Sequence, residues 1–222
     1  MFRHIPNILT GLRLVLAAVF FAMLSYFQYE GRGNWLLNVA FIIYVIAMVT
    51  DYLDGHLARK WHVEGAFGRV VDPFVDKVLV LGTFIFFAGK NFIIPEPTHT
   101  GSGQMFFLTI SGVAPYMVVI LLARELLVTS LRGMAESMGA KFGADMGGKV
   151  KMGFQSGTIL AILIYVNYRQ AFSPSAEFGW RCLRDFGIWS TLAITIFSSF
   201  SYIRRGIVLF GRGNVPIPAE TE

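Results

Sequence analysis

The chain alternates between long apolar segments and short polar connections. Six of the segments approach the length of about 20 residues that an α-helix needs to cross a membrane. They run over Ile8–Phe27, Trp35–Leu57, Val70–Ala88, Gln104–Leu131, Met152–Tyr168 and Phe186–Ile203. Because open strands cannot span lipid, we interpret all six as helices. The pattern predicts an all-α integral membrane protein, a six-transmembrane-helix bundle that forms one membrane-embedded catalytic domain over residues 1–222.

The composition supports a membrane protein. Of the 222 residues, 55% are hydrophobic and 15% are charged, whereas a soluble domain carries about a quarter charged residues. We interpret the net charge of +5 as basic residues that flank the spans and face anionic headgroups, so no nucleic-acid partner is expected. The single cysteine, Cys182, excludes an internal disulfide. The first apolar segment is too long for a signal peptide and lacks a cleavage site.

The lysines and arginines between the spans predict the orientation. They are more numerous on the side that would carry both chain termini, which is typical of the cytoplasmic side. We therefore expect a multi-pass protein of the cytoplasmic (inner) membrane, with the inner ends of the second and third spans open to the cytoplasm.

Those two inner ends carry four aspartates: Asp51, Asp54, Asp72 and Asp76. At about 100° per residue, Asp51 and Asp54 share an arc of one helix with Gly55 and Ala58, and Gly68 shares a face of the next helix with the other two. Ionisable groups inside membrane segments indicate a functional site. A cluster of hard oxygen ligands favours Mg²⁺ or Mn²⁺, and a pair of such ions suits displacement at phosphorus. The alternative is that these residues are helix caps and exposed end charges.

The same residues carry a resemblance to a known family. The spacing D-x2-D-G-x2-A-R-x8-G-x3-D-x3-D, from Asp51 to Asp76, resembles the signature of the CDP-alcohol phosphatidyltransferases at every fixed position. The resemblance implies a membrane enzyme with six transmembrane helices, in which an alcohol attacks the β-phosphorus of a CDP-linked lipid and CMP leaves. It also implies a homodimer.

The resemblance further implies roles for individual residues. Asp51, Asp54 and Asp72 match the metal ligands, and Asp76 matches a residue that lies near the metals and acts as general base. The residues that match contacts to the CDP-lipid are Gly55, Ala58 and Arg59, with Gly68 at a close-packing position.

The first segment opens with a polar stripe. Asn7, Thr10 and Arg13 are spaced three residues apart, which places them along one slanting side of an apolar helix. Either Arg13 snorkels and the stripe anchors the helix in the interface, or the stripe faces the nucleotide in the catalytic cavity. The pattern P-N-x2-T-x2-R resembles the start of bacterial phosphatidylglycerophosphate synthases, so we expect Asn7 and Thr10 to contact the CDP-lipid.

Four cations in or directly beside the fourth and fifth segments predict a phosphate pocket: Arg124, Arg132, Lys149 and Lys151. An arginine as deep as Arg124 needs an anionic partner, either Glu125 and the aspartates or a phosphate. The alternative for the lysines is ordinary flanking of a span on the cytoplasmic side. The strings A-R-E-x4-S-L-R and G-K-x-K resemble the phosphatidylglycerophosphate synthase subgroup, whose acceptor is sn-glycerol 3-phosphate.

Two further expectations concern single elements. Lys77 follows Asp76 directly, and we expect it to turn toward headgroups or an aspartate. The last segment carries no recognisable site residue.

The sequence thus predicts transfer of the phosphatidyl group of CDP-diacylglycerol to glycerol 3-phosphate, with two Mg²⁺ or Mn²⁺ ions and membrane lipids around the bundle. The same chemistry with phosphatidylglycerol, as in cardiolipin synthesis, or with inositol phosphate stays open. From other classes, a cation transporter could line its pathway with the four aspartates, but it would not require Gly55, Ala58, Arg59 and Gly68. A structural scaffold would not retain four costly charges.

Overall fold

The structure is a computed structural model. It describes residues 5–29, 34–61, 66–94, 109–138 and 146–211. Within these ranges it describes the backbone alone, and not the side chains, of residues 5–10, 52–61, 66–73, 146–149, 205 and 208–211.

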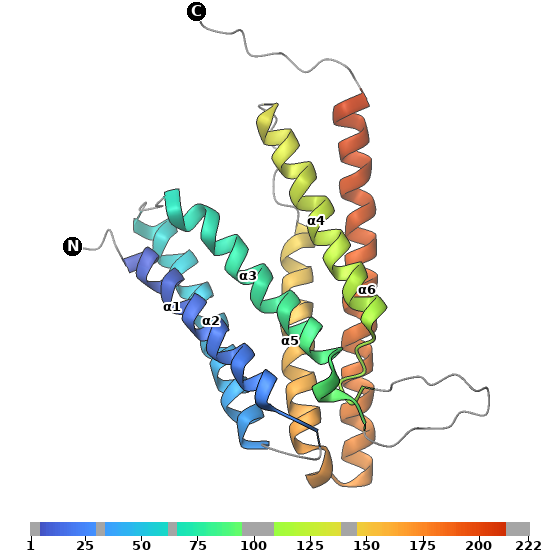
Figure 1. The fold of residues 1–222 in the computed structure, drawn as a ribbon. Coiled ribbons are helices and arrows are strands. Elements are labelled where there is room, and N and C mark those ends of the chain that lie inside the picture. The colour runs from blue at the N-terminus through green and yellow to red at the C-terminus, as the bar shows by residue number, and fades with distance from the viewer. Residues whose placement is uncertain (1–4, 30–33, 62–65, 95–108, 139–145, 212–222) are drawn as a thin grey trace, which may run out of the picture.

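Six long helices make up most of the described chain (Figure 1), and two short 3-10 turns adjoin them. They are α1 (Ile5–Tyr26), α2 (Asn34–Trp61), α3 (Ala66–Phe87), η2 (Lys90–Phe92), α4 (Pro115–Ser137), α5 (Met146–Tyr168), η3 (Arg169–Ala171) and α6 (Pro174–Gly211). Ile93 and Thr109 form an isolated antiparallel bridge, and no described residue belongs to a longer strand. Each predicted apolar segment overlaps one long helix, so the all-α prediction is confirmed.

The predicted start of the fourth segment is wrong. Residues 109–114 are not helical, and α4 begins at Pro115, where a missing N–H costs nothing. Before it, Gly112 adopts a positive φ of 75°, and Thr109 pairs with Ile93. These residues are apolar enough to extend a hydropathy pattern, but a left-handed glycine and a proline end a helix.

Other helix boundaries also differ from the prediction, most of all in α5 and α6. Helix α5 begins at Met146 rather than Met152, and α6 runs from Pro174 to Gly211 rather than from Phe186 to Ile203. In both cases the predicted segment ended where polar residues begin, but polar residues can continue a helix beyond its apolar part.

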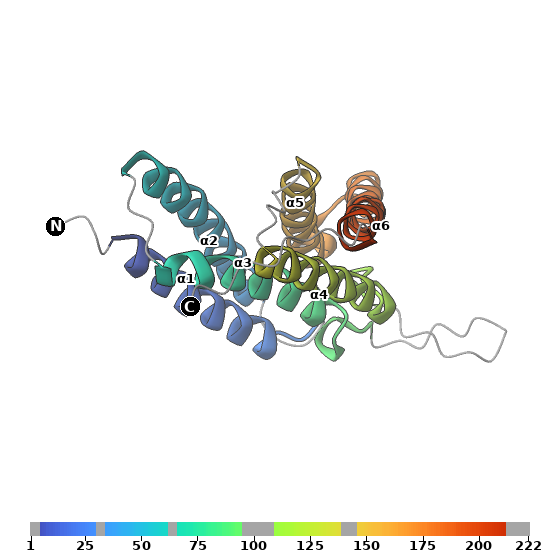
Figure 2. The ribbon, with the colours of Figure 1, turned by 90° about the horizontal axis from the view of Figure 1, so that it is seen from above.

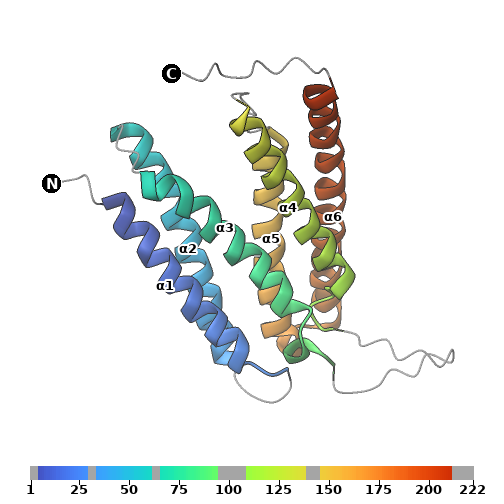
Figure 3. The same cartoon turned by 45° about the horizontal axis from the view of Figure 1, so that its top comes forward.

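The helices form two groups of three. Helix α1 packs against α2 and α3, and α6 packs against α4 and α5. Helix α3 joins the groups through contacts with α4 and α5, and α2 also contacts α5. Figures 2 and 3 show α3 in the middle of the arrangement. Successive helices run in alternating directions, so α1, α3 and α5 begin at the end of the bundle where α2, α4 and α6 finish (Figure 1). We call this the amino end.

Close helix packing depends on small residues at two crossings. A Cβ on Gly82 of α3 would lie 2.4 Å from the ring of Phe21 on α1. A Cβ on Gly187 of α6 would lie 2.8 Å from the hydroxyl of Thr158 on α5. Glycine therefore lets both pairs of backbones approach each other. At the end of the bundle opposite the amino end, buried aromatic residues fill the core, among them Phe27, Phe84, Phe87 and Phe92.

Charged residues also connect the helices at the end of the bundle opposite the amino end. Arg184 donates to the carbonyl of Ile110 at 2.7 Å and lies 4.7 Å from the ring centroid of Tyr165. Arg169 donates to Glu177 at 2.8 Å. The hydrogen bond to Glu177 raises the pKa of the Arg169 guanidinium above its ordinary value. These contacts connect α5, α6 and the segment before α4.

The outer surface is apolar. Large hydrophobic side chains point outward from every long helix, including Val15, Val49, Phe74, Val119, Phe154, Trp189 and Phe197. Two stretches of the described helices, Asn34–Asp51 and Pro174–Arg204, are long and apolar enough to cross a membrane. An exposed apolar surface of this extent suits lipid. Membrane association is therefore supported, while the count of six spans stays a prediction.

Candidate active site

One buried arginine brings two of the predicted site aspartates together. Nη1 of Arg13, on α1, lies 2.9 Å from Oδ1 of Asp51 on α2 and 3.0 Å from Oδ1 of Asp76 on α3. The Arg13 side chain is 0% exposed. Since one nitrogen reaches both carboxylates, three helices meet at this point of the amino end. We call Arg13, Asp51 and Asp76 the acid cluster.

Burial excludes the snorkelling alternative for Arg13. A snorkelling arginine extends its head group to water, whereas this guanidinium lies inside the bundle between two carboxylates. The polar stripe on the first segment therefore faces α2 and α3 at Arg13. Its spacing of three residues was the signal, but the sequence did not identify its partners.

The other two predicted metal ligands lie on the same helices. Asp54 follows Asp51 by three residues on α2, and Asp72 precedes Asp76 by one turn on α3. Their side chains lie outside the described residues. Among the side chains that are described, no group of three or more potential ligands is assembled. The described pair nevertheless suits a hard divalent cation, because both members contribute carboxylate oxygen.

The predicted contacts to the CDP-lipid can be located only by their helices. Helix α1 carries Asn7 and Thr10 in its first two turns, and α2 carries Gly55, Ala58 and Arg59 near its C-terminus. Gly68 lies in the first turn of α3. All of these side chains lie outside the described residues, so their roles stay predictions.

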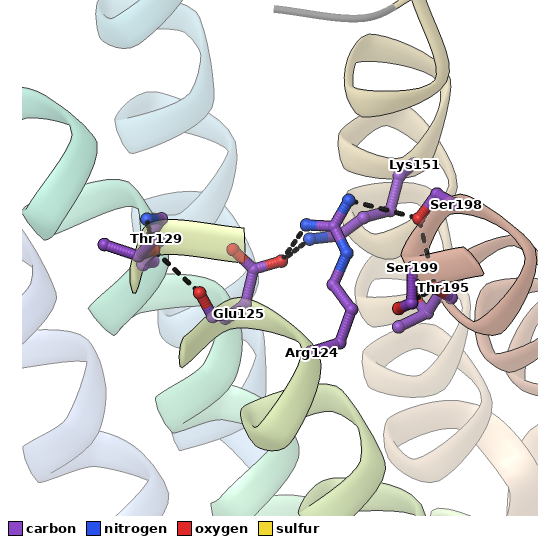
Figure 4. A network of polar contacts seen from close by, with 8 residues as sticks. Arg124, Glu125, Thr129, Lys151, Thr195, Ser198 and Ser199 are labelled. Carbon is purple, nitrogen blue, oxygen red and sulfur yellow. Dashed lines mark hydrogen bonds and ion pairs between the residues drawn. The ribbon is translucent and has the colours of Figure 1, made fainter. Parts of the chain in front are cut away.

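A second charged cluster is built around Glu125 on α4. Its Oε1 accepts a hydrogen bond from Arg124 Nη1 at 2.7 Å and forms an ion pair with Lys151 of α5 (Figure 4). The exposed fractions are 8% for Arg124, 8% for Glu125 and 4% for Lys151. We call these three residues the cation cluster. Of the four predicted phosphate-binding residues, the structure brings Arg124 and Lys151 together around one acid.

The structure does not join the other two predicted phosphate-binding cations, Arg132 and Lys149, to the cation cluster through described contacts. Arg132 follows Arg124 by two turns on α4, and no described hydrogen bond or ion pair joins it to the cation cluster. The side chain of Lys149 lies outside the described residues. Since α5 begins before both lysines, residues 149 and 151 project about 200° apart, and Lys151 is the one found buried.

Lys77 connects α3 to α4 beside the cation cluster, and its described partner is a hydroxyl rather than the aspartate that was one of its two predicted partners. Its Nζ donates to the hydroxyl of Thr129 at 2.7 Å, and that hydroxyl donates to the backbone carbonyl of Glu125 at 2.7 Å. Asp76 and Lys77 are neighbours on α3, so this helix presents one residue to the acid cluster and the next to α4. The path from Lys77 through Thr129 depends on the packing of α3 against α4.

Helix α6 also contributes contacts to the cation cluster, although its sequence carried no recognisable site residue. Nη2 of Arg124 donates to the hydroxyl of Ser198 at 3.1 Å. The guanidinium carbon of Arg124 lies 5.5 Å from the ring centroid of Tyr202. The available signal was a stripe of polar residues spaced three and four apart in an apolar helix: Thr195, Ser198, Ser199 and Tyr202.

Comparisons with known proteins agree with the motif. The family model described as CDP-alcohol phosphatidyltransferase matches residues 3–197. A Bacillus subtilis protein is 28% identical over an alignment of 212 positions that covers 91% of this chain and 94% of that protein. A Yersinia enterocolitica protein is 30% identical over 162 residues, 72% and 76% of the two chains. A Cereibacter sphaeroides protein is 34% identical over 140 residues, but these are 62% of this chain and 51% of that protein. All three are named CDP-diacylglycerol–glycerol-3-phosphate 3-phosphatidyltransferase.

Proposed function

Because this chain belongs to the CDP-alcohol phosphatidyltransferase family, we propose that it transfers the phosphatidyl group of CDP-diacylglycerol to sn-glycerol 3-phosphate. The products are phosphatidylglycerophosphate and CMP. The names of the similar proteins support this reaction. The structural observation that carries the proposal is the placement of Asp76 and Lys77. Through these adjacent residues, α3 joins the acid cluster to the helix that carries Arg124 and Glu125.

The acid cluster is the proposed place for divalent metal ions. Two ions, Mg²⁺ or Mn²⁺, would be held by Asp51, Asp54, Asp72 and Asp76, and Arg13 would orient the first and last of these carboxylates. When bound, the ions supply positive charge that neutralises the pyrophosphate and the departing CMP. Carboxylates suit this role, because Mg²⁺ and Mn²⁺ prefer oxygen ligands.

The cation cluster is the proposed site for the phosphate of the acceptor. Arg124 uses Nη1 for Glu125 and Nη2 for Ser198, while its buried Nε has no hydrogen-bond partner among the described residues. That N–H is a donor suited to an anion. Lys151, together with Arg132 and Lys149, adds positive charge for the dianionic group of glycerol 3-phosphate.

The transfer step then follows from the two sites. The carboxylate of Asp76 accepts the proton of the acceptor hydroxyl as the oxygen attacks the β-phosphorus of CDP-diacylglycerol. One P–O bond forms to the acceptor, the P–O bond to CMP breaks, and CMP takes the electron pair. Gly55, Ala58 and Arg59 contact the CDP group, with Gly68 beside them. Asn7 and Thr10 also approach it from α1.

We also propose the cellular arrangement. The six helices each cross the cytoplasmic (inner) membrane, and the amino end of the bundle faces the cytoplasm, where glycerol 3-phosphate is available. The excess of basic residues at this end supports the orientation. The chain functions as a homodimer, as the family resemblance implies.

The direct test is incorporation of radiolabelled glycerol 3-phosphate into lipid by the purified protein supplied with CDP-diacylglycerol. We expect labelled phosphatidylglycerophosphate and an equal amount of CMP, both lost with EDTA and restored by excess Mg²⁺ or Mn²⁺. Parallel reactions with phosphatidylglycerol and inositol phosphate test the other acceptors. CMP release with one of those acceptors and none with glycerol 3-phosphate would overturn the assignment. Nucleotide-independent cation flux across sealed vesicles, without CMP release, would favour a transporter.

A further inference from the structure

The two α6 residues that contact Arg124, Ser198 and Tyr202, lie beyond the part of the chain that the family model covers. The model match ends at residue 197, whereas α6 continues to Gly211. Ser198 comes directly after that end, Tyr202 comes four residues later, and both contact Arg124. We propose that these two residues are positioning residues that set the affinity for the acceptor phosphate by fixing the guanidinium of Arg124. This inference rests on the proposed function.

The contacts hold the guanidinium in two directions. At the edge of the guanidinium, the Ser198 hydroxyl accepts a hydrogen bond from Nη2. The Tyr202 ring lies within cation–π distance, with its centroid 5.5 Å from the guanidinium carbon. Tyr202 is 2% exposed. A cation–π contact is stronger when both partners are removed from water. Together with the hydrogen bond to Glu125, these contacts restrict both the plane and the rotation of the guanidinium.

The Ser198 hydroxyl is itself oriented. It donates to the backbone carbonyl of Thr195 at 3.0 Å, so its lone pairs remain to accept from Arg124. Figure 4 shows Ser198 directed toward Arg124, while the neighbouring Ser199 lies beside Thr195. Ser199 also donates to the Thr195 carbonyl, at 2.7 Å, and makes no described contact with Arg124. The chain therefore provides a matched control: two adjacent serines with the same backbone bond, one of which contacts the arginine.

A fixed guanidinium presents its remaining N–H to the acceptor without a further loss of side-chain entropy on binding. An arginine side chain loses rotamer entropy when it is ordered, and a group that is already ordered binds more tightly for that reason. Because Arg124 is assigned to the phosphate and not to the reacting oxygen, loosening it weakens binding of the acceptor. The chemical step and binding of the CDP-lipid stay as they were.

The test is steady-state kinetics on the full chain with each substrate varied in turn. We expect Tyr202→Leu to raise the KM for glycerol 3-phosphate about tenfold, with kcat and the KM for CDP-diacylglycerol changed by less than about twofold. Tyr202→Phe retains the ring face and should restore a near-wild-type KM. Ser198→Ala should raise the same KM about threefold, and Ser199→Ala should leave it unchanged.

The outcomes separate the inference from the function on which it rests. A wild-type chain that does not use glycerol 3-phosphate would overturn both. An active wild type whose KM is unchanged in Tyr202→Leu and Ser198→Ala would overturn the inference alone. Equal losses for both substrates, or the same defect in Tyr202→Phe and Tyr202→Leu, would show a merely structural role. If Tyr202→Leu fails to elute as a folded protein, the pair Ser198→Ala and Ser199→Ala decides the question.

Discussion

The acid cluster and the cation cluster are built on the same plan with the charges exchanged. In the first, the buried cation Arg13 lies between the carboxylates of Asp51 and Asp76. In the second, the buried acid Glu125 lies between Arg124 and Lys151. Each cluster thus contains two charged side chains of one sign around a single side chain of the opposite charge, and so carries a net charge. The central residue places the outer two, and the net charge suits the proposed ligand, a metal ion in one case and a phosphate in the other.

The difference in sign also explains why the clusters are neighbours but separate. A metal ion needs negative ligands, whereas a phosphate needs positive ones. An enzyme that uses both therefore needs two sites of opposite charge, and these sites must meet at the reacting atoms. Here α3 lies between the sites, with Asp76 directed to one and Lys77 to α4 beside the other. An uncompensated buried charge costs several kcal/mol. In the acid cluster the two carboxylates therefore offset the buried charge of Arg13, and in the cation cluster Glu125 offsets the buried charges of Arg124 and Lys151.

The largest effect is expected from an outer member of the acid cluster. Asp76→Asn removes the proposed base and one charge, and should lower kcat by about 10²- to 10⁴-fold, measured as CMP release at saturating substrates. The protein should still elute as a folded species. Asp185→Asn is the control, because that acid pairs with Arg184 on α6 at the other end of the bundle. Near-wild-type turnover by Asp76→Asn would contradict the assignment of the base.

Removing the central residue of the acid cluster should affect both stability and activity. Arg13→Gln leaves Asp51 and Asp76 together without the guanidinium, so we expect a lower thermal unfolding midpoint in detergent and kcat reduced by about 10- to 100-fold. Arg13→Lys keeps the charge but not the geometry, and should recover part of the midpoint.

The control for Arg13 is Arg181→Gln, since Arg181 is an exposed arginine on α6. An unchanged midpoint in Arg13→Gln would show that the guanidinium does not bridge the two acids in the native protein.

An outer member of the cation cluster should give the smallest and most selective effect. Lys151→Met leaves Glu125 paired with Arg124, so stability should change little. The KM for glycerol 3-phosphate should rise about tenfold, with the KM for CDP-diacylglycerol unchanged. Lys90→Met, at the exposed opposite end, is the control. A rise in the KM for the CDP-lipid alone would mean that the cations bind the nucleotide and not the acceptor.

The accuracy of the predictions from the sequence depended on whether a feature is local. The apolar runs predicted all six helices, because helix formation follows from the residues of each segment. The boundaries were less accurate, because Gly112 and Pro115 delay the start of α4 without lowering the hydropathy of the sequence. The first turns of α6, in contrast, are polar and still helical. The positions of Asp51 and Asp76 followed from a motif in which every member lies within a few turns of the next.

The remaining features came from packing between distant segments. Arg13 lies 63 residues from Asp76, and Arg124 lies 74 residues from Ser198. Nothing in the local pattern selects those partners over lipid headgroups or solvent. Lys77 illustrates the same limit, because its neighbour Asp76 suggested an acidic partner and the structure provides Thr129 from α4.

By itself, the sequence determined that the chain is helical and apolar, that it carries the CDP-alcohol phosphatidyltransferase motif, and which helices bear the acids and the cations. The tertiary structure alone decided that Arg13 joins two acids, that Glu125 joins two cations, and that α6 contributes Ser198 and Tyr202. The physical reason is that helical periodicity assigns each side chain to a face from its own segment. The partner of a buried charge, in contrast, is chosen by how whole helices pack, and that choice depends on residues throughout the chain.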